Sequence, residues 1–196
     1  MRRLAFLIAP LVMMAVGCST TPGDAAYRAG HAQQAAELYR AEANQGDAEA
    51  ALKLGLLLDE GKVSPAIFGT AGQAFTKGCK LGSLASCHNV GVAYEYGKNG
   101  LAQDRSEART YYEKAAKLGY MQSQYNLASL YANRYFSNDI EGYKWLLVSQ
   151  MQAEKCASQP LCEWVLRDPP GHKQKLHDRM SEQDLRTAKQ QASAWR

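Results

Sequence analysis

The sequence predicts an all-α protein, a short solenoid of helical pairs closed by one further helix at its C-terminal end. Two observations lead to this fold. The first is amphipathic helical spacing over most of the chain, with Gly-rich connections between the helices. The second is an internal repeat, because Gly46, Gly82 and Gly119 each follow the last apolar or small residues of a helical stretch. Their intervals of 36 and 37 residues are typical of stacked helical pairs.

The repeat extends through matched positions on both sides of the three glycines. Small residues lie eleven and three positions before each glycine, and an aromatic residue lies seven positions before it. An apolar residue follows eight positions after it, a small residue nine after, and a large apolar residue twelve after. The matched sets are Ala35, Ala71 and Ala108; Tyr39, Phe75 and Tyr112; Ala43, Cys79 and Ala116; Leu54, Val90 and Leu127; Gly55, Gly91 and Ala128; and Leu58, Tyr94 and Tyr131. Small residues beside large ones suit helices that pack at short range.

The helices can be placed in order from this period and from their capping residues. We expect a shortened helix over 25–29 and then helices over 31–44, 47–60, 70–81, from Ser83 into the Gly97 loop, 105–118, 121–133 and 140–153. Asp47, Ser83 and Asp104 stand where N-caps belong. The connection after residue 60 holds Pro65 and three apolar residues, which we expect to pack against the array: Val63, Ile67 and Phe68.

After Cys156 the repeat stops. Pro169-Pro170-Gly171 interrupts the chain, so a short helix over 173–179 is expected to stand alone. A last helix begins at an N-cap Ser181 and carries Leu185, Ala188, Ala192 and Trp195 at helical spacing. We interpret it as the capping helix that shields the last repeat from water.

The N-terminal segment predicts export and lipidation. Arg2 and Arg3 precede an apolar run over 4–16, which is shorter than the roughly 20 residues of a membrane-spanning helix and fits a signal peptide. The sequence Ala15-Val16-Gly17-Cys18 resembles a bacterial lipobox, with Cys18 as the lipid acceptor and Ser19 favouring the outer membrane. The alternative is an ordinary secretory signal. We therefore divide the chain into a lipoprotein signal peptide (1–17), a lipidated tether (18–24), an array of about three repeats (25–155) and a disulfide loop with the capping helix (156–196).

The cysteines agree with export. Assigning Cys18 to lipid leaves four others, an even number. Cys79 and Cys87 flank the turn at Gly82, and antiparallel helices joined by a tight turn bring such positions to disulfide distance. Cys156 and Cys162 bracket a segment in which Pro160 is expected to prevent a helix, so they are able to close a small loop. The alternative is four buried thiols.

The repeat unit resembles the Sel-one-like repeat (SLR), a relative of the tetratricopeptide repeat. The motifs that carry the resemblance, over about residues 30–155, are Val90–Tyr94 and Leu127–Tyr131 on first helices, Gly97, Gly100 and Asp104 in the loop, and Ala108 with Tyr111–Ala116 on the second helix. The resemblance implies a right-handed α-α solenoid, and the Cys-x7-Cys spacing resembles the family's cysteine-rich bacterial lipoprotein branch.

The resemblance also implies a function. Together with the lipobox-like sequence and Ser19, it indicates a periplasm-facing lipoprotein of the outer membrane that binds a protein or peptide of the cell envelope through the concave face of its first helices. We expect this protein to be a monomer. A surface-exposed or secreted factor that binds a host protein is one alternative. A penicillin-binding protein or β-lactamase-like hydrolase is the other, and only the resemblance supports it.

The residues themselves do not favour an enzyme. No Ser is followed three places later by Lys, no His-x-His occurs, and neither a P-loop nor a dinucleotide fingerprint is present. His172 and His177 fit solvated residues better than a metal pair, and His88 fits a packing or surface residue. We therefore expect no catalytic residue, metal or cofactor. Removal of Arg2 and Arg3 lowers the formal net charge from +4 to +2, so nucleic acid is not an expected partner.

Aromatic residues offer candidates for binding. Tyr39, Tyr94, Tyr112 and Tyr131 occupy repeat positions, so core packing explains them. Candidates for protein binding lie outside those positions: Tyr96, Tyr120, Tyr125, Arg134, Tyr135 and Phe136.

Overall fold

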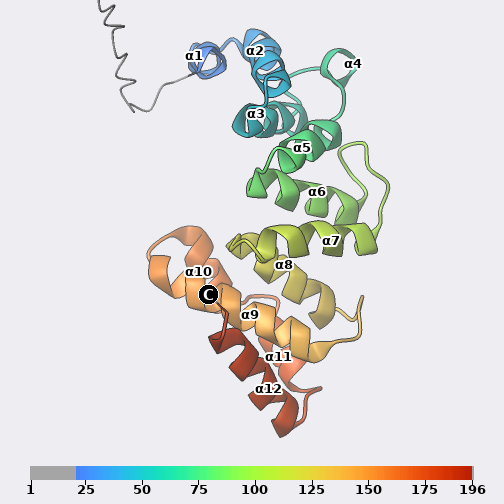
Figure 1. The fold of residues 1–196 in the computed structure, drawn as a ribbon, viewed down its shortest axis with the longest axis vertical. Helices are drawn as coiled ribbons and strands as arrows, with labels where there is room; N and C mark the ends of the chain where they lie inside the picture. Colours follow the sequence, from blue (N-terminus) through green and yellow to red (C-terminus); the bar gives the residue numbers. More distant parts are fainter. Residues whose placement is uncertain (1–20, 196) are drawn as a thin grey trace, which may run out of the picture.

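The computed structural model describes residues 21–195, and within this range all regular structure is helical (Figure 1). The signal peptide and Cys18 lie outside the described residues. The helices are α1 (Pro22–Arg28), α2 (Ala32–Asn44), α3 (Ala48–Asp59), α4 (Pro65–Phe68), α5 (Ala71–Lys80), α6 (Leu84–Tyr96), α7 (Arg105–Ala116), α8 (Met121–Ala132), α9 (Asp139–Ala153), the 3-10 turn η1 (Glu154–Cys156), α10 (Pro160–Arg167), α11 (His172–His177) and α12 (Glu182–Ser193).

The helices stack as consecutive antiparallel pairs, which confirms the α-solenoid (Figure 1). The full pairs are α3 with α5, α6 with α7, and α8 with α9, and the shortened α1 with α2 precedes them. We call α3, α6 and α8 the first helices and α5, α7 and α9 the second helices. The side chains of Asp47, Ser83 and Asp104 accept hydrogen bonds from backbone N–H groups at the starts of α3, α6 and α7, as predicted. The loops inside the last two full pairs lie on one side of the array, opposite the turns between pairs (Figure 1).

A glycine opposite an aromatic ring fixes the close approach of the helices within a pair. A Cβ on Gly55 would lie 2.4 Å from the ring of Phe75, and a Cβ on Gly91 would lie 2.6 Å from the ring of Tyr112. The third full pair has Ala128 at the glycine position, and the aromatic position there is Ser149. Among the three full pairs, a methyl side chain thus occurs at this position only in the pair that lacks an aromatic residue at the other matched position.

The connection between α3 and α5 packs only in part as expected. Val63 and Phe68 are buried, whereas Ile67 is 55% exposed, so its predicted packing is wrong. Pro65 opens the single-turn helix α4, since proline fits a first helical position, where its missing N–H is not needed.

Both predicted disulfides are present. Cys79 near the end of α5 bonds to Cys87 in the first turn of α6, with 4.5 Å between their Cα atoms. Cys156 at the end of η1 bonds to Cys162 in α10 across a Cα separation of 5.8 Å. The first bond joins two successive pairs, and the second holds α10 to the end of the array.

The C-terminal region differs from the sequence expectation in two respects. Pro160 does not prevent a helix but starts α10, again at the first helical position. The short helix α11 does not stand alone, because it packs on α8 and α9 through the fully buried Leu176. The final helix α12 lies against α9, and its apolar side chains Leu185, Ala188 and Ala192 are buried there, as expected of a cap.

Within residues 21–195, no helix has the length and apolar character needed to cross a bilayer.

Candidate functional site

The first helices present a regular row of solvent-accessible residues. Four matched positions of each full pair, spaced by the same 36 and 37 residues, are partly or fully exposed. They are Glu49, Lys53, Leu56 and Glu60 of the first full pair; Ala85, Asn89, Val92 and Tyr96 of the second; and Gln122, Asn126, Ser129 and Asn133 of the third. We call this set the first-helix face. It offers amides, charges and small apolar groups, which suit contact with another polypeptide.

The N-terminal end of the first-helix face is hollowed. A pocket of about 160 Å³ lies between α1, α2 and α3, and Tyr27, Tyr39 and Leu56 contribute to its mainly apolar lining. Lys53 donates to Asp24 at 2.8 Å, and the hydroxyl of Tyr39 donates to the same carboxylate at 2.9 Å. The ammonium of Lys53 lowers the pKa of Asp24 and keeps it ionised.

The other end of the face is closed by the segment around α10 and α11. Tyr125 is only 2% exposed, and its hydroxyl donates to the buried carboxylate of Asp168. Its ring packs against Trp164 and against His172, which is also buried. The expectations that Tyr125 binds a partner and that His172 is solvated are therefore wrong. Both side chains are buried because α10 and α11 fold back over α8.

Arginine and aromatic side chains gather where the first helices end. The guanidinium carbon of Arg105 lies 4.1 Å from the ring centroid of Tyr135, and that of Arg109 lies 4.3 Å from the centroid of Phe136. Arg134 and Tyr135 are exposed in the loop between α8 and α9, and Tyr96, at the end of α6, is 66% exposed. We call these six residues the Arg-aromatic edge.

Glu95, a buried carboxylate, directly precedes Tyr96 of the Arg-aromatic edge. Glu95 is 6% exposed and accepts a hydrogen bond of 2.7 Å from the hydroxyl of Tyr112. Asn126 of the first-helix face donates to that same hydroxyl at 3.2 Å. Burial raises the pKa of Glu95, against the opposing effects of the Tyr112 and Tyr96 hydroxyls and of the charge of Arg105. The network links the face to the edge.

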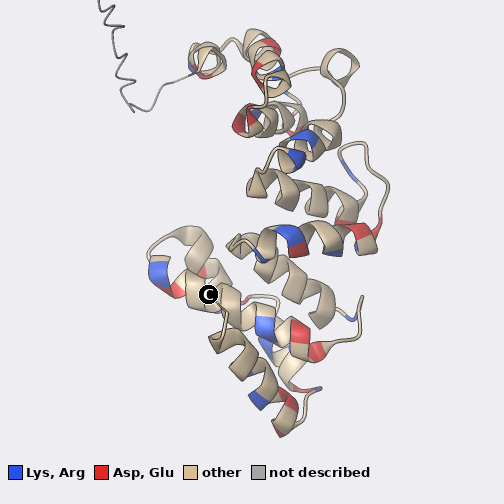
Figure 2. Cartoon of the chain, viewed as in Figure 1, with Lys and Arg blue, Asp and Glu red and all other residues tan. Residues whose placement is uncertain are grey.

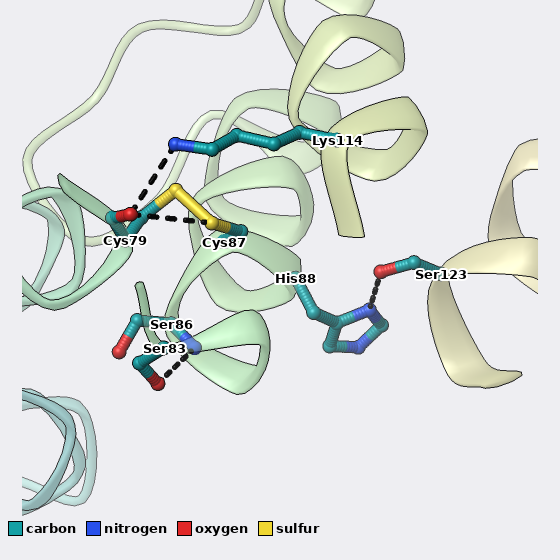
Figure 3. The surroundings of a disulfide bond; sticks show 7 residues. All are labelled: Cys79, Ser83, Ser86, Cys87, His88, Lys114 and Ser123. Carbon is teal, nitrogen blue, oxygen red and sulfur yellow. Dashed lines mark hydrogen bonds between the residues drawn. A yellow bond between two sulfur atoms is a disulfide. The ribbon is translucent and has the colours of Figure 1, made fainter. Parts of the chain in front are cut away.

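One histidine and one serine lie close enough together to be compared with the base and the nucleophile of a hydrolase. Nδ1 of His88 lies 3.1 Å from the hydroxyl of Ser123, beside the Cys79–Cys87 disulfide (Figure 3). Ser123 is fully buried, so a substrate has no access to its oxygen. Burial lowers the pKa of His88 to about 4, and its ring packs against Tyr112 and Tyr120. The pair therefore joins α6 to α8 as a packing contact. Of the two roles that the sequence left open for His88, packing residue or surface residue, the structure shows the first.

Charge and metal-ligand patterns add no further site. Within residues 21–195, no three His, Cys, Asp or Glu side chains converge as a metal site would require. Figure 2 shows acidic and basic segments scattered over the helices rather than gathered in one basic stripe.

The structure groups the sequence candidates into two sets. Tyr96, Arg134, Tyr135 and Phe136 belong to the Arg-aromatic edge. Tyr120 and Tyr125 lie at the opposite end of α8, where Tyr120 is only partly exposed.

Sequence analysis missed the central polar residues of the face and the arginines of the edge. Lys53, Asn89 and Asn126 stand seven positions after Gly46, Gly82 and Gly119, so the period itself would have revealed them. The period could not have revealed Arg105 and Arg109, because their aromatic partners lie in the next pair, in the loop between α8 and α9.

The geometry thus defines an α-solenoid with an accessible first-helix face. The Sel1 repeat profile matches residues 84–120 and 122–147. This part of the chain therefore carries Sel1 repeats, and Sel1 repeat proteins generally mediate protein–protein interactions.

One curated protein is similar in sequence, and two solved structures are similar in fold. A Xenopus tropicalis protein named cytochrome c oxidase assembly factor 7 is 33% identical over 105 residues, which are 50% of this chain and 46% of that protein. The solved structure of c5321, a protective antigen of uropathogenic Escherichia coli with an SLR fold, aligns with a TM-score of 0.63 at 18% identity, over 88% of this chain and 38% of the other. A Sel1 repeat protein from Oxalobacter formigenes aligns with a TM-score of 0.53 at 24% identity, over 63% and 51%. The chain spans about half the length of the curated relative that it matches.

Proposed function

We propose that this protein is a lipid-anchored module of the bacterial cell envelope that faces the periplasm and binds a protein or peptide partner on its first-helix face. The observation that carries the proposal is the continuity of that face, in which matched accessible positions recur in three successive pairs. An extended or helical segment of a partner would meet accessible side chains at equivalent positions of each repeat, and such binding needs no catalytic group.

The envelope location rests on the sequence and on the cysteines. Cys18 stands in a lipobox-like sequence, and the four remaining cysteines are all paired in disulfides. Disulfides persist in oxidising compartments such as the periplasm and are rare in the cytosol. Both observations support export, and the lipid on Cys18 would hold the folded array close to the membrane.

Affinity capture with matched variants tests the binding proposal. The purified protein is incubated with a native envelope extract, and retained proteins are quantified by mass spectrometry. Lys53→Glu with Asn89→Arg changes two central positions of the face, whereas Lys80→Glu with Thr110→Arg makes the same charge changes on exposed second-helix positions. We expect one or a few proteins to be lost with the first variant and kept with the second. Equal retention by both variants would contradict the proposal.

A fluorescent penicillin tests the hydrolase alternative on the same preparation. We expect no covalent label on the folded protein. Stoichiometric labelling would show that the chain is more than a binding module.

A further inference from the structure

We propose that the Arg-aromatic edge binds carboxylate groups of the partner, so that the segment bound beside the first-helix face is an acidic peptide. This inference rests on the proposed function and adds the chemistry of the partner. Three features of the edge carry it: unpaired arginines, stacked guanidinium groups, and a pocket beside them.

Two arginines of the edge lack a negative partner. Neither Arg105 nor Arg134 forms an ion pair with any carboxylate among residues 21–195, and the buried Nε of Arg105 has no hydrogen-bond partner there. Two carboxylates of the helices beside the edge are already engaged. Asp139 binds Arg179 through both oxygens, and Glu113 pairs with Arg109 at 3.6 Å.

Glu95 does not take the place of an external anion. Its carboxylate is buried and bound by the hydroxyl of Tyr112, and it does not come within ion-pair distance of Arg105. The positive charge of Arg105 acts on the buried Glu95 carboxylate only from beyond ion-pair distance, so Arg105 and Arg134 can both still pair with a carboxylate of a ligand. Charge complementarity favours an anionic ligand at this place.

Stacking prepares Arg105 for a carboxylate. A guanidinium group that lies over an aromatic ring can use its face for that contact, whereas its N–H donors lie in its plane. The Nε of Arg105 is buried, so a ligand would pair with the two Nη groups. The ring of Tyr135 also limits the motion of the side chain, which lowers the entropy lost on binding. A planar fork of donors matches a carboxylate in a bidentate arrangement.

The pocket beside the edge indicates a peptide rather than a free anion. It measures about 370 Å³, and its lining includes Arg134, Phe136 and the Asp139–Arg179 pair. This volume is large enough for a neighbouring side chain of the same ligand. Tyr96 belongs both to the edge and to the first-helix face, so a bound chain can continue from one to the other. A single-stranded nucleic acid fits less well, because Figure 2 shows no basic stripe along which its backbone would run.

Peptide selection tests the inference. A phage library of random twelve-residue peptides is panned against the wild-type protein, and binding of the selected peptides is then measured by fluorescence anisotropy. The test variant is Arg105→Gln with Arg134→Gln. The control variant is Arg186→Gln with Lys189→Gln, which removes the same charge from exposed positions of α12. Circular dichroism confirms that each variant keeps its helices.

We expect the selected peptides to be enriched in Asp and Glu. Their affinity should fall about tenfold in the test variant, equivalent to about 1.4 kcal/mol, and less than twofold in the control. Tyr135→Ala, which keeps every charge but removes the stacking partner of Arg105, should weaken binding about threefold.

Several outcomes would overturn the inference. The selected peptides could lack enrichment in Asp and Glu, or no peptide could be selected. The affinity of the selected peptides could be unchanged in the test variant, or an oligo-dT strand could bind more tightly than they do. These results leave the proposed function to be judged by the envelope capture, which depends on Lys53 and Asn89 and not on the edge.

Discussion

Replacement of Gly91 by alanine tests the packing rule that shapes the array. In an exposed helix interior this change stabilises a protein by about 1 kcal/mol, because alanine has the higher helix propensity. Here the new methyl group would lie 2.6 Å from two ring atoms of Tyr112. Overpacking of this kind costs about 1–3 kcal/mol. A displaced Tyr112 would also leave the buried Glu95 carboxylate without its donor, at a further cost of about 1–3 kcal/mol.

We therefore expect Gly91→Ala to lower the free energy of unfolding by about 2–3 kcal/mol, because the two costs exceed the gain in propensity. For a chain of this size the melting temperature would fall by roughly 5–10 °C. Urea unfolding followed by circular dichroism measures the effect. Asn89→Ala on the same helix is the control, since it gains propensity without a clash.

A second background isolates the contact with the ring. Tyr112→Ser with Gly91→Ala recreates the combination that the third pair has at Ser149 and Ala128. In the Tyr112→Ser background, Gly91→Ala should stabilise by about 1 kcal/mol, so the double-mutant cycle should give a coupling of about 3–4 kcal/mol. If Gly91→Ala stabilises the protein equally in both backgrounds, the ring does not set the helix spacing and the reasoning is refuted.

Three further predictions concern the disulfide, the anchor and pH. Replacing Cys79 and Cys87 by alanine should cost about 2–3 kcal/mol by loop entropy and lower the melting temperature by several degrees while helical content stays; an unchanged melting temperature would contradict a structural role. Cys18→Ser should abolish labelling by a palmitate analogue and processing by lipoprotein signal peptidase, and a labelled variant would rule out this anchor. Because the pKa of His88 is lowered to about 4 from an unfolded value near 6.5, the unfolded chain binds more protons between these values, so stability should fall by up to about 3 kcal/mol as pH drops from 6.5 to 4. His88→Asn should flatten that slope in urea titrations, and an unchanged slope would assign it to other groups.

The repeat period made most of the array predictable. The glycines of the turns, the N-caps at Asp47, Ser83 and Asp104 and the aromatic positions of the core all follow local rules that hold within a helix or its ends. The Cys79–Cys87 bond was predictable for the same reason, because a short turn fixes the distance between its flanking residues.

Contacts between distant segments could not be predicted in this way. Nothing in the sequence around Tyr125 indicates that it is buried. It is buried because α10 and α11 return over α8. Pro160 breaks a helix in its interior but not at its first position, and the sequence alone did not distinguish the two. The Arg-aromatic edge joins Arg105 to Tyr135 across 30 residues of chain, a juxtaposition that only the stacked pairs create.

The most direct test of the central claim is photocrosslinking in intact cells from single positions of the array. A benzophenone amino acid is placed at Asn89 or Asn126 on the first-helix face and, for comparison, at Lys80 or Lys117 at matched exposed positions of the second helices. We predict that the two face positions give an adduct with the same envelope protein and that the second-helix positions do not. Adducts that arise from the second helices instead, or none from the face, would contradict the account.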